Sequence, residues 1–235
     1  MTVEEIVAEL KKKGSTSTKN VLMKHGAKEP FYGVKVADLK VIQKKVKKNH
    51  ELALELYDTG ISDARYLAGL IAEPAKMTKK QLQHWVKNAN WYMLTEYTVA
   101  WVAAESNYGW ELAMEWIDSK NEGIASCGWS TLSSIVAIKQ DDELDMAALK
   151  KLLKRVEKEI DKAANRVKYT MNGFVISVGC YVTSLTETAT ATAHKLGQVY
   201  VDMGGTACKV PLATDYIDKV ADKGRLGKKR KTAIC

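Results

Sequence analysis

Signals that start helices recur along the whole of this sequence, whereas patterns typical of strands hardly occur. Thr2 and Glu5 form the capping-box pattern, in which each side chain accepts a hydrogen bond from the other residue's backbone N–H group. Asp145 stands before residues 146–163, whose apolar positions fall on one helical stripe. Residues 199–201 alone have the composition of a strand. The chain is therefore predicted to be all-α.

The spacing of these helices indicates how they pack. About a dozen helices of three to four turns are expected, in pairs that recur roughly every 35 to 45 residues. Pro30, Pro74 and Pro211 each fall at a predicted helix boundary. This periodicity favours a helical-repeat solenoid of antiparallel helix pairs over a closed bundle. Residues 1–223 are expected to form a single repeat domain, and residues 224–235 a basic C-terminal tail.

The composition excludes several classes of protein. An apolar content of 46% excludes disorder, and the longest apolar run, residues 171–182, is shorter than the roughly 20 residues that cross a bilayer. No basic-then-apolar signal segment opens the chain. The histidines and cysteines show no metal-ligand spacing, so no metal, cofactor or membrane partner is expected. The scattered cysteines are Cys127, Cys180, Cys208 and Cys235. A cytoplasmic monomer with reduced thiols is predicted.

The basic and aromatic residues are segregated along the chain. The net charge is +8, yet Lys120 is the one basic residue between Lys87 and Lys139, a segment that holds five of the six tryptophans. Lysines and arginines crowd the two ends instead. This arrangement suits a protein that holds phosphates outside and places aromatic rings and a carboxylate against a nucleotide. A tryptophan-rich core in an ordinary helical domain explains the same pattern, and both interpretations stay open.

Two basic clusters are candidates for phosphate contacts. Lys40, Lys44 and Lys48 recur every four residues and form one predicted ridge, which is either a phosphate track or a solvated face. The segment GRLGKKRK at residues 224–231 is expected to be flexible and to add non-specific affinity for DNA, in keeping with a location at the nucleoid.

The segment WYMLTE at residues 91–96 combines aromatic rings with an acid. Tyr92 and Glu96 are four residues apart, so on an α-helix the ring and the carboxylate share one face. Cleavage of an N-glycosidic bond builds positive charge on the sugar, which a carboxylate stabilises, and aromatic faces attract a cationic alkylated base. The alternative is that Trp91 packs in the core and Glu96 is a solvated helix carboxylate.

Four short motifs occur in an order and spacing that resemble a known family. They are FYGV followed by ADLK within residues 31–40, DAR at 63–65, WYMLTE at 91–96 and WIDSKN at 116–121. Over about residues 31 to 182 the chain resembles a divergent member of the DNA alkylation repair family, the HEAT-like-repeat alkylpurine DNA glycosylases of the AlkD type. The resemblance implies a HEAT-like solenoid whose positively charged concave face wraps duplex DNA. It also implies release of cationic 3- and 7-alkylpurines without flipping of the base.

The resemblance assigns roles to particular residues and reveals a departure. Glu96 takes the position of the catalytic acid, where the family usually has Asp, and Tyr92 takes that of a tryptophan lining the cleft. The family's DNA-contacting arginine falls on Ser126, and residues 123–138 contain no Lys or Arg. This loss points to weakened DNA binding and a branch of the family with another task.

The remaining candidates complete the predicted site. Trp129 is either a stacking face or a residue buried between helices, and Asn172 binds a substrate or satisfies a neighbouring backbone group. The predicted aromatic cleft consists of Trp91, Tyr92, Trp129, Tyr169, Asn172 and Phe174. The predicted DNA contacts are Lys40, Lys44, Lys48, Arg65, Lys168, Arg225, Lys228, Lys229 and Arg230.

Three functions are consistent with these residues. The first is excision of cationic N-alkylated purines from duplex DNA, with Glu96 stabilising the developing sugar cation. The second is a non-catalytic DNA-binding paralogue that recognises bent or branched DNA. The third is a helical-repeat scaffold for a protein partner, which would lack the steep salt dependence of a phosphate-binding protein.

Overall fold

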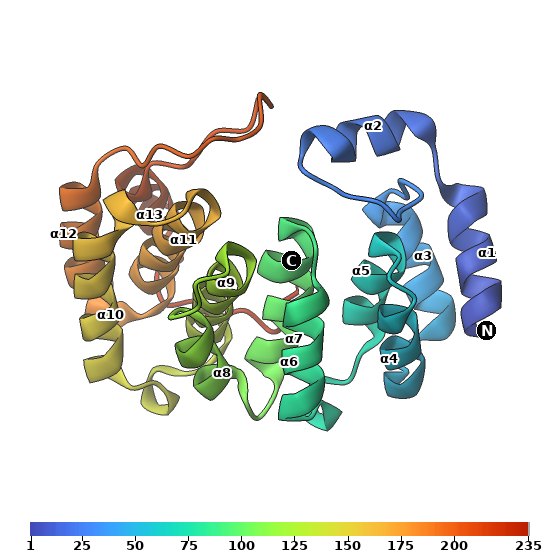
Figure 1. Ribbon diagram of the computed structural model, residues 1–235. Coiled ribbons are helices and arrows are strands. Elements are labelled where there is room, and N and C mark those ends of the chain that lie inside the picture. The colour runs from blue at the N-terminus through green and yellow to red at the C-terminus, as the bar shows by residue number, and fades with distance from the viewer. Residues whose placement is uncertain (235) are drawn as a thin grey trace.

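Residues 1–234 are described by the structure, a computed structural model, and all of their regular secondary structure is helical; Cys235 lies outside this range. Figure 1 shows the helices side by side in a curved row. The first seven α-helices are α1 (Val3–Lys13), α2 (Thr16–Lys24), α3 (Val36–Val46), α4 (His50–Asp58), α5 (Ser62–Ile71), α6 (Lys79–Asn88) and α7 (Ala100–Glu105). The others are α8 (Gly109–Trp116), α9 (Glu122–Ile138), α10 (Met146–Glu159), α11 (Asn165–Tyr181), α12 (Thr186–Leu196) and α13 (Ala213–Asp222).

Five short helical turns complete the set. Four are 3-10 turns, η1 (Pro74–Lys76), η3 (Asp141–Glu143), η4 (Ile160–Lys162) and η5 (Thr183–Leu185), and one, η2 (Met93–Val99), is a π-helix that leads into α7. The strand-like composition of residues 199–201 does not produce a strand, because this segment is an irregular part of the connection between α12 and α13.

The helices form two layers that follow the curve of the row. In one layer α5, η2, α9, α11 and α13 contact one another in succession. Helices of the second layer pack against them, with α4 on α5, α8 on α9 and α12 on α11 (Figure 1). The predicted helical-repeat solenoid of paired helices is confirmed, and the first layer carries the residues of the site described below.

The predicted helix starts are formed by their capping side chains. The Thr2 hydroxyl accepts a hydrogen bond from the Glu5 N–H group and the Glu5 carboxylate accepts one from the Thr2 N–H group, which is the reciprocal capping box. Asp145 caps α10 by accepting a hydrogen bond from the Ala148 N–H group at 2.9 Å. Such caps satisfy N–H groups that have no partner inside the helix.

Most of the tryptophans lie in the core, in agreement with the interpretation of a tryptophan-rich core in a helical domain. Trp85 and Trp116 are fully buried, and Trp85 stacks on Tyr57 with ring centroids 4.2 Å apart. Trp129 is also fully buried and packs against Phe174, with centroids 5.3 Å apart. The core therefore extends through the layer contacts, and these rings are not available to a ligand.

Two glycines of the first layer respond oppositely to an added methyl group. A Cβ atom on Gly128 would lie 2.7 Å from the Ile117 backbone nitrogen, where α9 crosses close to α8, whereas one on Gly173 would meet nothing within 4 Å. We expect Gly128→Ala to lower the free energy of unfolding by about 1–3 kcal/mol through overpacking. Gly173→Ala should raise it by up to about 1 kcal/mol through helix propensity. Urea unfolding of both variants measures this difference, and equal stabilities would contradict the close approach.

The C-terminal tail packs against the solenoid, contrary to the flexible segment that its composition predicted. The Gly227 N–H group donates to the Cys180 carbonyl at 2.8 Å, and the Arg230 N–H group donates to the Ala137 carbonyl at 2.7 Å. Further along, the Ala233 N–H group donates to the Glu105 carboxylate at 2.6 Å. The tail thus crosses the C-terminal ends of α11, α9 and α7 in turn.

Candidate functional site

The acid of the WYMLTE segment lies in a widened helical turn. The spacing argument assumed an α-helix, but residues 93–99 form the π-helix η2. Because a π-helix joins residues five apart, side chains four apart are rotated from the positions they take on an α-helix. Tyr92 remains half-buried, whereas Glu96 is only 5% exposed. Glu96 is therefore a buried carboxylate, and the alternative in which it is a solvated helix carboxylate is wrong.

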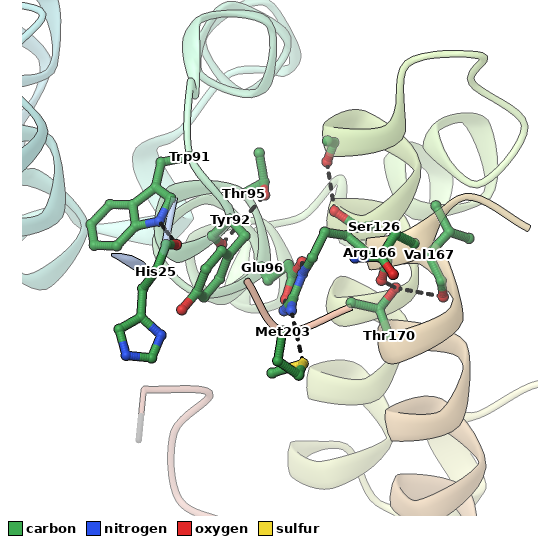
Figure 2. A network of polar contacts seen from close by, with 12 residues as sticks. His25, Trp91, Tyr92, Thr95, Glu96, Ser126, Arg166, Val167, Thr170 and Met203 are labelled. Carbon is green, nitrogen blue, oxygen red and sulfur yellow. Dashed lines mark hydrogen bonds and ion pairs between the residues drawn. The ribbon is translucent and has the colours of Figure 1, made fainter. Parts of the chain in front are cut away.

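Both oxygens of Glu96 are bound by a single arginine of α11. Arg166 donates from Nε to Oε1 at 2.8 Å and from Nη2 to Oε2, which makes a bidentate ion pair across 70 residues of sequence. The guanidinium lies between two aromatic rings, 4.3 Å from the centroid of Tyr92 and 4.3 Å from that of Tyr169. Figure 2 shows Arg166 reaching Glu96 beside the Tyr92 ring. Paired hydrogen bonds and cation–π contacts hold this cation in one orientation.

Further contacts tie Arg166 to the elements around it. Its backbone N–H group donates to the Glu122 carboxylate at 2.7 Å, and Nη1 lies 4.0 Å from the sulfur of Met203 in the loop before α13. Burial raises the pKa of the Glu96 carboxyl, and the hydrogen bonds from Arg166 act in the opposite direction. Burial also raises the pKa of the Tyr92 and Tyr169 phenols, so both rings are neutral partners of the cation. The pair is consequently a link between distant helices.

Two cavities meet at this ion pair. The larger, of about 920 Å³, we call the serine groove because Ser130, Ser133 and Ser134 of α9 and Ser177 of α11 line it. The smaller, of about 600 Å³, lies on the other side, and we call it the loop groove because the loop before α13 forms part of its wall. Residues that line the loop groove include His25, Trp91, Tyr92, Arg166 and Met203. Glu96 reaches the serine groove, so the ion pair forms part of the partition between the two cavities.

The predicted aromatic cleft is brought together only in part. Trp91 and Tyr92 line the loop groove, and Tyr169 lines the serine groove. Trp91 is held by a 2.7 Å hydrogen bond from Nε1 to the His25 carbonyl (Figure 2). These rings come from two helical segments that pack through the Glu96–Arg166 pair.

The other predicted cleft residues lie in the core, which for Trp129 and Asn172 agrees with the second of the two alternatives stated above. Trp129 and Phe174 are buried against each other because they face the interior between α9 and α11. Asn172 is 1% exposed, and its amide donates to the Pro211 carbonyl at 2.9 Å, so it fixes the start of the α13 region. None of these three side chains lines either cavity.

Two of the predicted DNA contacts have structural partners instead. Lys48 lies beyond the end of α3 and donates to the Leu70 carbonyl at 3.1 Å and the Ala72 carbonyl at 2.8 Å. The predicted ridge of three lysines on one helix is therefore wrong, although Lys40 and Lys44 are exposed on α3. Arg65 donates to the carbonyls of Tyr57 and Asn88, at 3.0 Å and 2.7 Å, and joins two helix ends.

The remaining predicted DNA contacts gather on the C-terminal side. Lys168 is half-buried on α11, and Arg225 and Lys228 are exposed on the tail. Lys229 is bonded to Asp141 at 2.8 Å and to the Val136 carbonyl at 3.0 Å. The tail members Arg225, Lys228, Lys229 and Arg230 all line the serine groove.

Arg166 is the site residue that the sequence-based reasoning missed. The resemblance placed the family's DNA-contacting arginine within residues 123–138, where this sequence has Ser126. In the structure Ser126 and Arg166 both line the loop groove, and Arg166 extends from α11 to bind Glu96. One signal was present, the i, i+3 placement of Arg166 and Tyr169, but nothing in the sequence pairs either residue with Glu96.

The described part of the chain shows neither a helix that could span a membrane nor a cluster of metal-ligand side chains. Within residues 1–234 no helix has both the length and the apolar character of a membrane span. The same residues contain no group of three or more His, Cys, Asp or Glu side chains arranged to hold a metal ion.

Comparisons with known proteins point in one direction. A family model described as DNA alkylation repair enzyme matches residues 6–195. Uncharacterized proteins of Listeria innocua and Listeria monocytogenes are each 32% identical over 229 residues, which covers 95% of this chain and 99% of theirs. A solved structure with 36% identity and a TM-score of 0.91 covers 100% of both chains. It is described as a new family of proteins related to the HEAT-like repeat DNA glycosylases with affinity for branched DNA structures.

Proposed function

Because the chain belongs to the DNA alkylation repair enzyme family, we propose that it is a non-catalytic DNA-binding member that recognises branched DNA. The observation that carries the proposal is the occupation of both Glu96 oxygens by Arg166. A carboxylate that assists base excision must approach the deoxyribose or a water molecule in the transition state. In this protein that carboxylate is buried and neutralised by a cation that two aromatic rings hold in place.

The likeness to the solved structure supports the choice of branched DNA. With 36% identity and a TM-score of 0.91 over the full length of both chains, the two proteins share their fold. The net charge of +8 and the basic residues beside the serine groove suit a polyanionic partner. Association with chromosomal DNA at the nucleoid is part of the same proposal.

Excision of alkylpurines remains the second candidate, since an acid and aromatic rings do converge at one place. Its decisive test is chromatography of bases released from methylated duplex DNA, with an active alkylpurine glycosylase as positive control. We expect no 3-methyladenine or 7-methylguanine above background from the wild-type protein. Release by the wild type that disappears in Glu96→Gln would establish excision and overturn the proposal.

Binding measurements test the positive side of the proposal. We expect a four-way junction to bind at least about tenfold more tightly than a linear duplex of the same sequence and length, at equal salt concentration. Fluorescence anisotropy with labelled DNA measures both affinities. Equal affinities for the junction and the duplex would contradict recognition of branched DNA.

A further inference from the structure

The serine groove has the form of a binding site for a narrow, anionic ligand. Two walls are built from adjoining helices, with Ser130 and Ser134 on α9 and Gly173 and Ser177 on α11. Their small side chains leave the hollow open between the helices, and the three serines are half-buried. Within residues 1–234, no hydrogen bond engages the hydroxyls of these three serines. They are therefore available to donate to an acceptor in the groove.

The charges around the serine groove are almost all positive. Its described lining residues include five basic side chains and one acid, Glu96, whose oxygens are occupied by Arg166. Three of the basic groups, Arg225, Lys228 and Lys231, are exposed and form no ion pair within residues 1–234. The tail places them along one edge because its backbone is bonded to the ends of α11 and α9. An anion that enters the groove would meet hydroxyl donors on the walls and cations on this edge.

Aromatic rings lie on the same surface. Tyr97 and Tyr169 line the groove near Glu96, and Tyr216 of α13 lines its other side and is 49% exposed. Tyr97 is fixed by an edge contact with Trp101, with ring centroids 5.5 Å apart. Aromatic rings next to a basic track are the feature by which proteins hold unpaired nucleotides, since every base offers a flat face for stacking.

We propose that the serine groove binds a single-stranded arm of branched DNA. Its phosphates meet the serine hydroxyls and the cations of the tail, and its bases stack on the exposed ring of Tyr216 and on the half-buried rings of Tyr97 and Tyr169 that line the groove. A cavity of about 920 Å³ has the size of a small-ligand site, so it admits a few unpaired nucleotides but not a duplex. The inference rests on the proposed function and adds to it, because it assigns the unpaired arm, and not the paired junction, to this groove.

The first test fills the groove without changing its charge. Ser134→Gln with Ser177→Gln places two longer side chains in the hollow, and glutamine favours a helix more than serine does. On forked DNA with one single-stranded arm, we expect the double variant to lose roughly tenfold in affinity, the scale of one or two stacked bases. On a fully paired four-way junction it should bind within about twofold of the wild type. The matched control is Ser17→Gln with Ser184→Gln, two exposed serines outside the groove, which should leave both affinities unchanged.

The second test locates the arm directly and does not depend on a variant that must fold. Forked DNA carrying 5-iodouracil in its single-stranded arm is irradiated with the wild-type protein, and crosslinked peptides are identified by mass spectrometry. We expect crosslinks to peptides that contain Tyr97, Tyr169 or Tyr216. Crosslinks confined to other surfaces, or unchanged binding of forked DNA by the Ser134 and Ser177 variant, would overturn the inference alone. Failure of the wild type to prefer any branched DNA over linear duplex would instead remove the proposed function, and the inference with it.

Discussion

Replacement of Arg166 by methionine is expected to lower the free energy of unfolding by about 3–5 kcal/mol at neutral pH, because it leaves the buried Glu96 carboxylate without a partner. The Arg166 side chain is 16% exposed and that of Glu96 2% exposed, so solvent screens the pair poorly. Methionine keeps an unbranched apolar side chain at this position but removes the guanidinium that binds Glu96 and contacts the Tyr92 and Tyr169 rings. Urea unfolding of the variant and the wild type measures the loss. The slope of the unfolding free energy against urea concentration should be the same for both proteins.

A half-buried arginine whose carboxylate partners are exposed provides the control. Arg155 also binds two carboxylates, Asp118 at 2.7 Å and Glu159 at 2.8 Å, but those partners are 67% and 50% exposed. Exposed pairs of this kind contribute about 0–1 kcal/mol, so Arg155→Met should cost far less than Arg166→Met. Similar losses of unfolding free energy in the two variants would show that burial of the Glu96–Arg166 pair does not determine the loss in Arg166→Met.

The loss in Arg166→Met depends on pH in a direction that follows from burial. Burial already raises the pKa of Glu96 in the wild type, and removal of the Arg166 hydrogen bonds raises it further. The folded variant therefore holds a proton that the unfolded chain releases, so its stability falls as pH rises above the ordinary glutamate range. The difference from the wild type should shrink as the pH is lowered from 8 to 5. Glu96→Gln combined with Arg166→Met should recover at least about 1 kcal/mol relative to Arg166→Met alone.

The fold was accessible from the sequence because its determinants are local. Capping residues such as Thr2 and Asp145 are read within a few positions of the helices they start. The apolar stripe of α10 also repeats within one element, and its buried residues Leu149, Leu152, Leu153 and Val156 follow it. Helix pairs joined by short turns pack as neighbours, so a solenoid follows from the order of the elements.

The site was less accessible because it is formed by distant contacts. The Glu96–Arg166 pair joins residues that are 70 positions apart, and no periodicity connects them. The π-helix η2 shifts Glu96 away from the position that α-helical spacing gives, so the predicted alignment with Tyr92 did not reveal the burial of the acid. Trp129 and Phe174 are aromatic residues, which occur in binding clefts as well as in cores. Only their packing between α9 and α11 shows that these two belong to the core.

The course of the C-terminal tail was likewise not accessible from its composition. Its basic composition suggested flexibility, whereas backbone hydrogen bonds to the ends of α11, α9 and α7 fix its course. Charge reversal of Arg225, Lys228 and Lys231 to glutamate should weaken binding to branched DNA roughly tenfold or more at low salt, because each cation displaces counterions from the DNA. The slope of the logarithm of affinity against the logarithm of salt concentration should become shallower by up to about 3. Anisotropy titrations at four or five salt concentrations give both quantities.

Helix α10 supplies a control with the same change in net charge. Lys150, Lys151 and Lys154 are exposed there and line neither cavity, so their reversal to glutamate alters the overall field but not the groove. We expect the α10 variant to retain most of the salt slope, since long-range effects of exposed charges are screened beyond about 10 Å at 0.1 M salt. If both variants lose affinity for branched DNA equally and their salt slopes become shallower by the same amount, binding depends on net charge and not on contacts made by the tail. A loss confined to the tail variant would mean that DNA phosphates approach this edge of the protein.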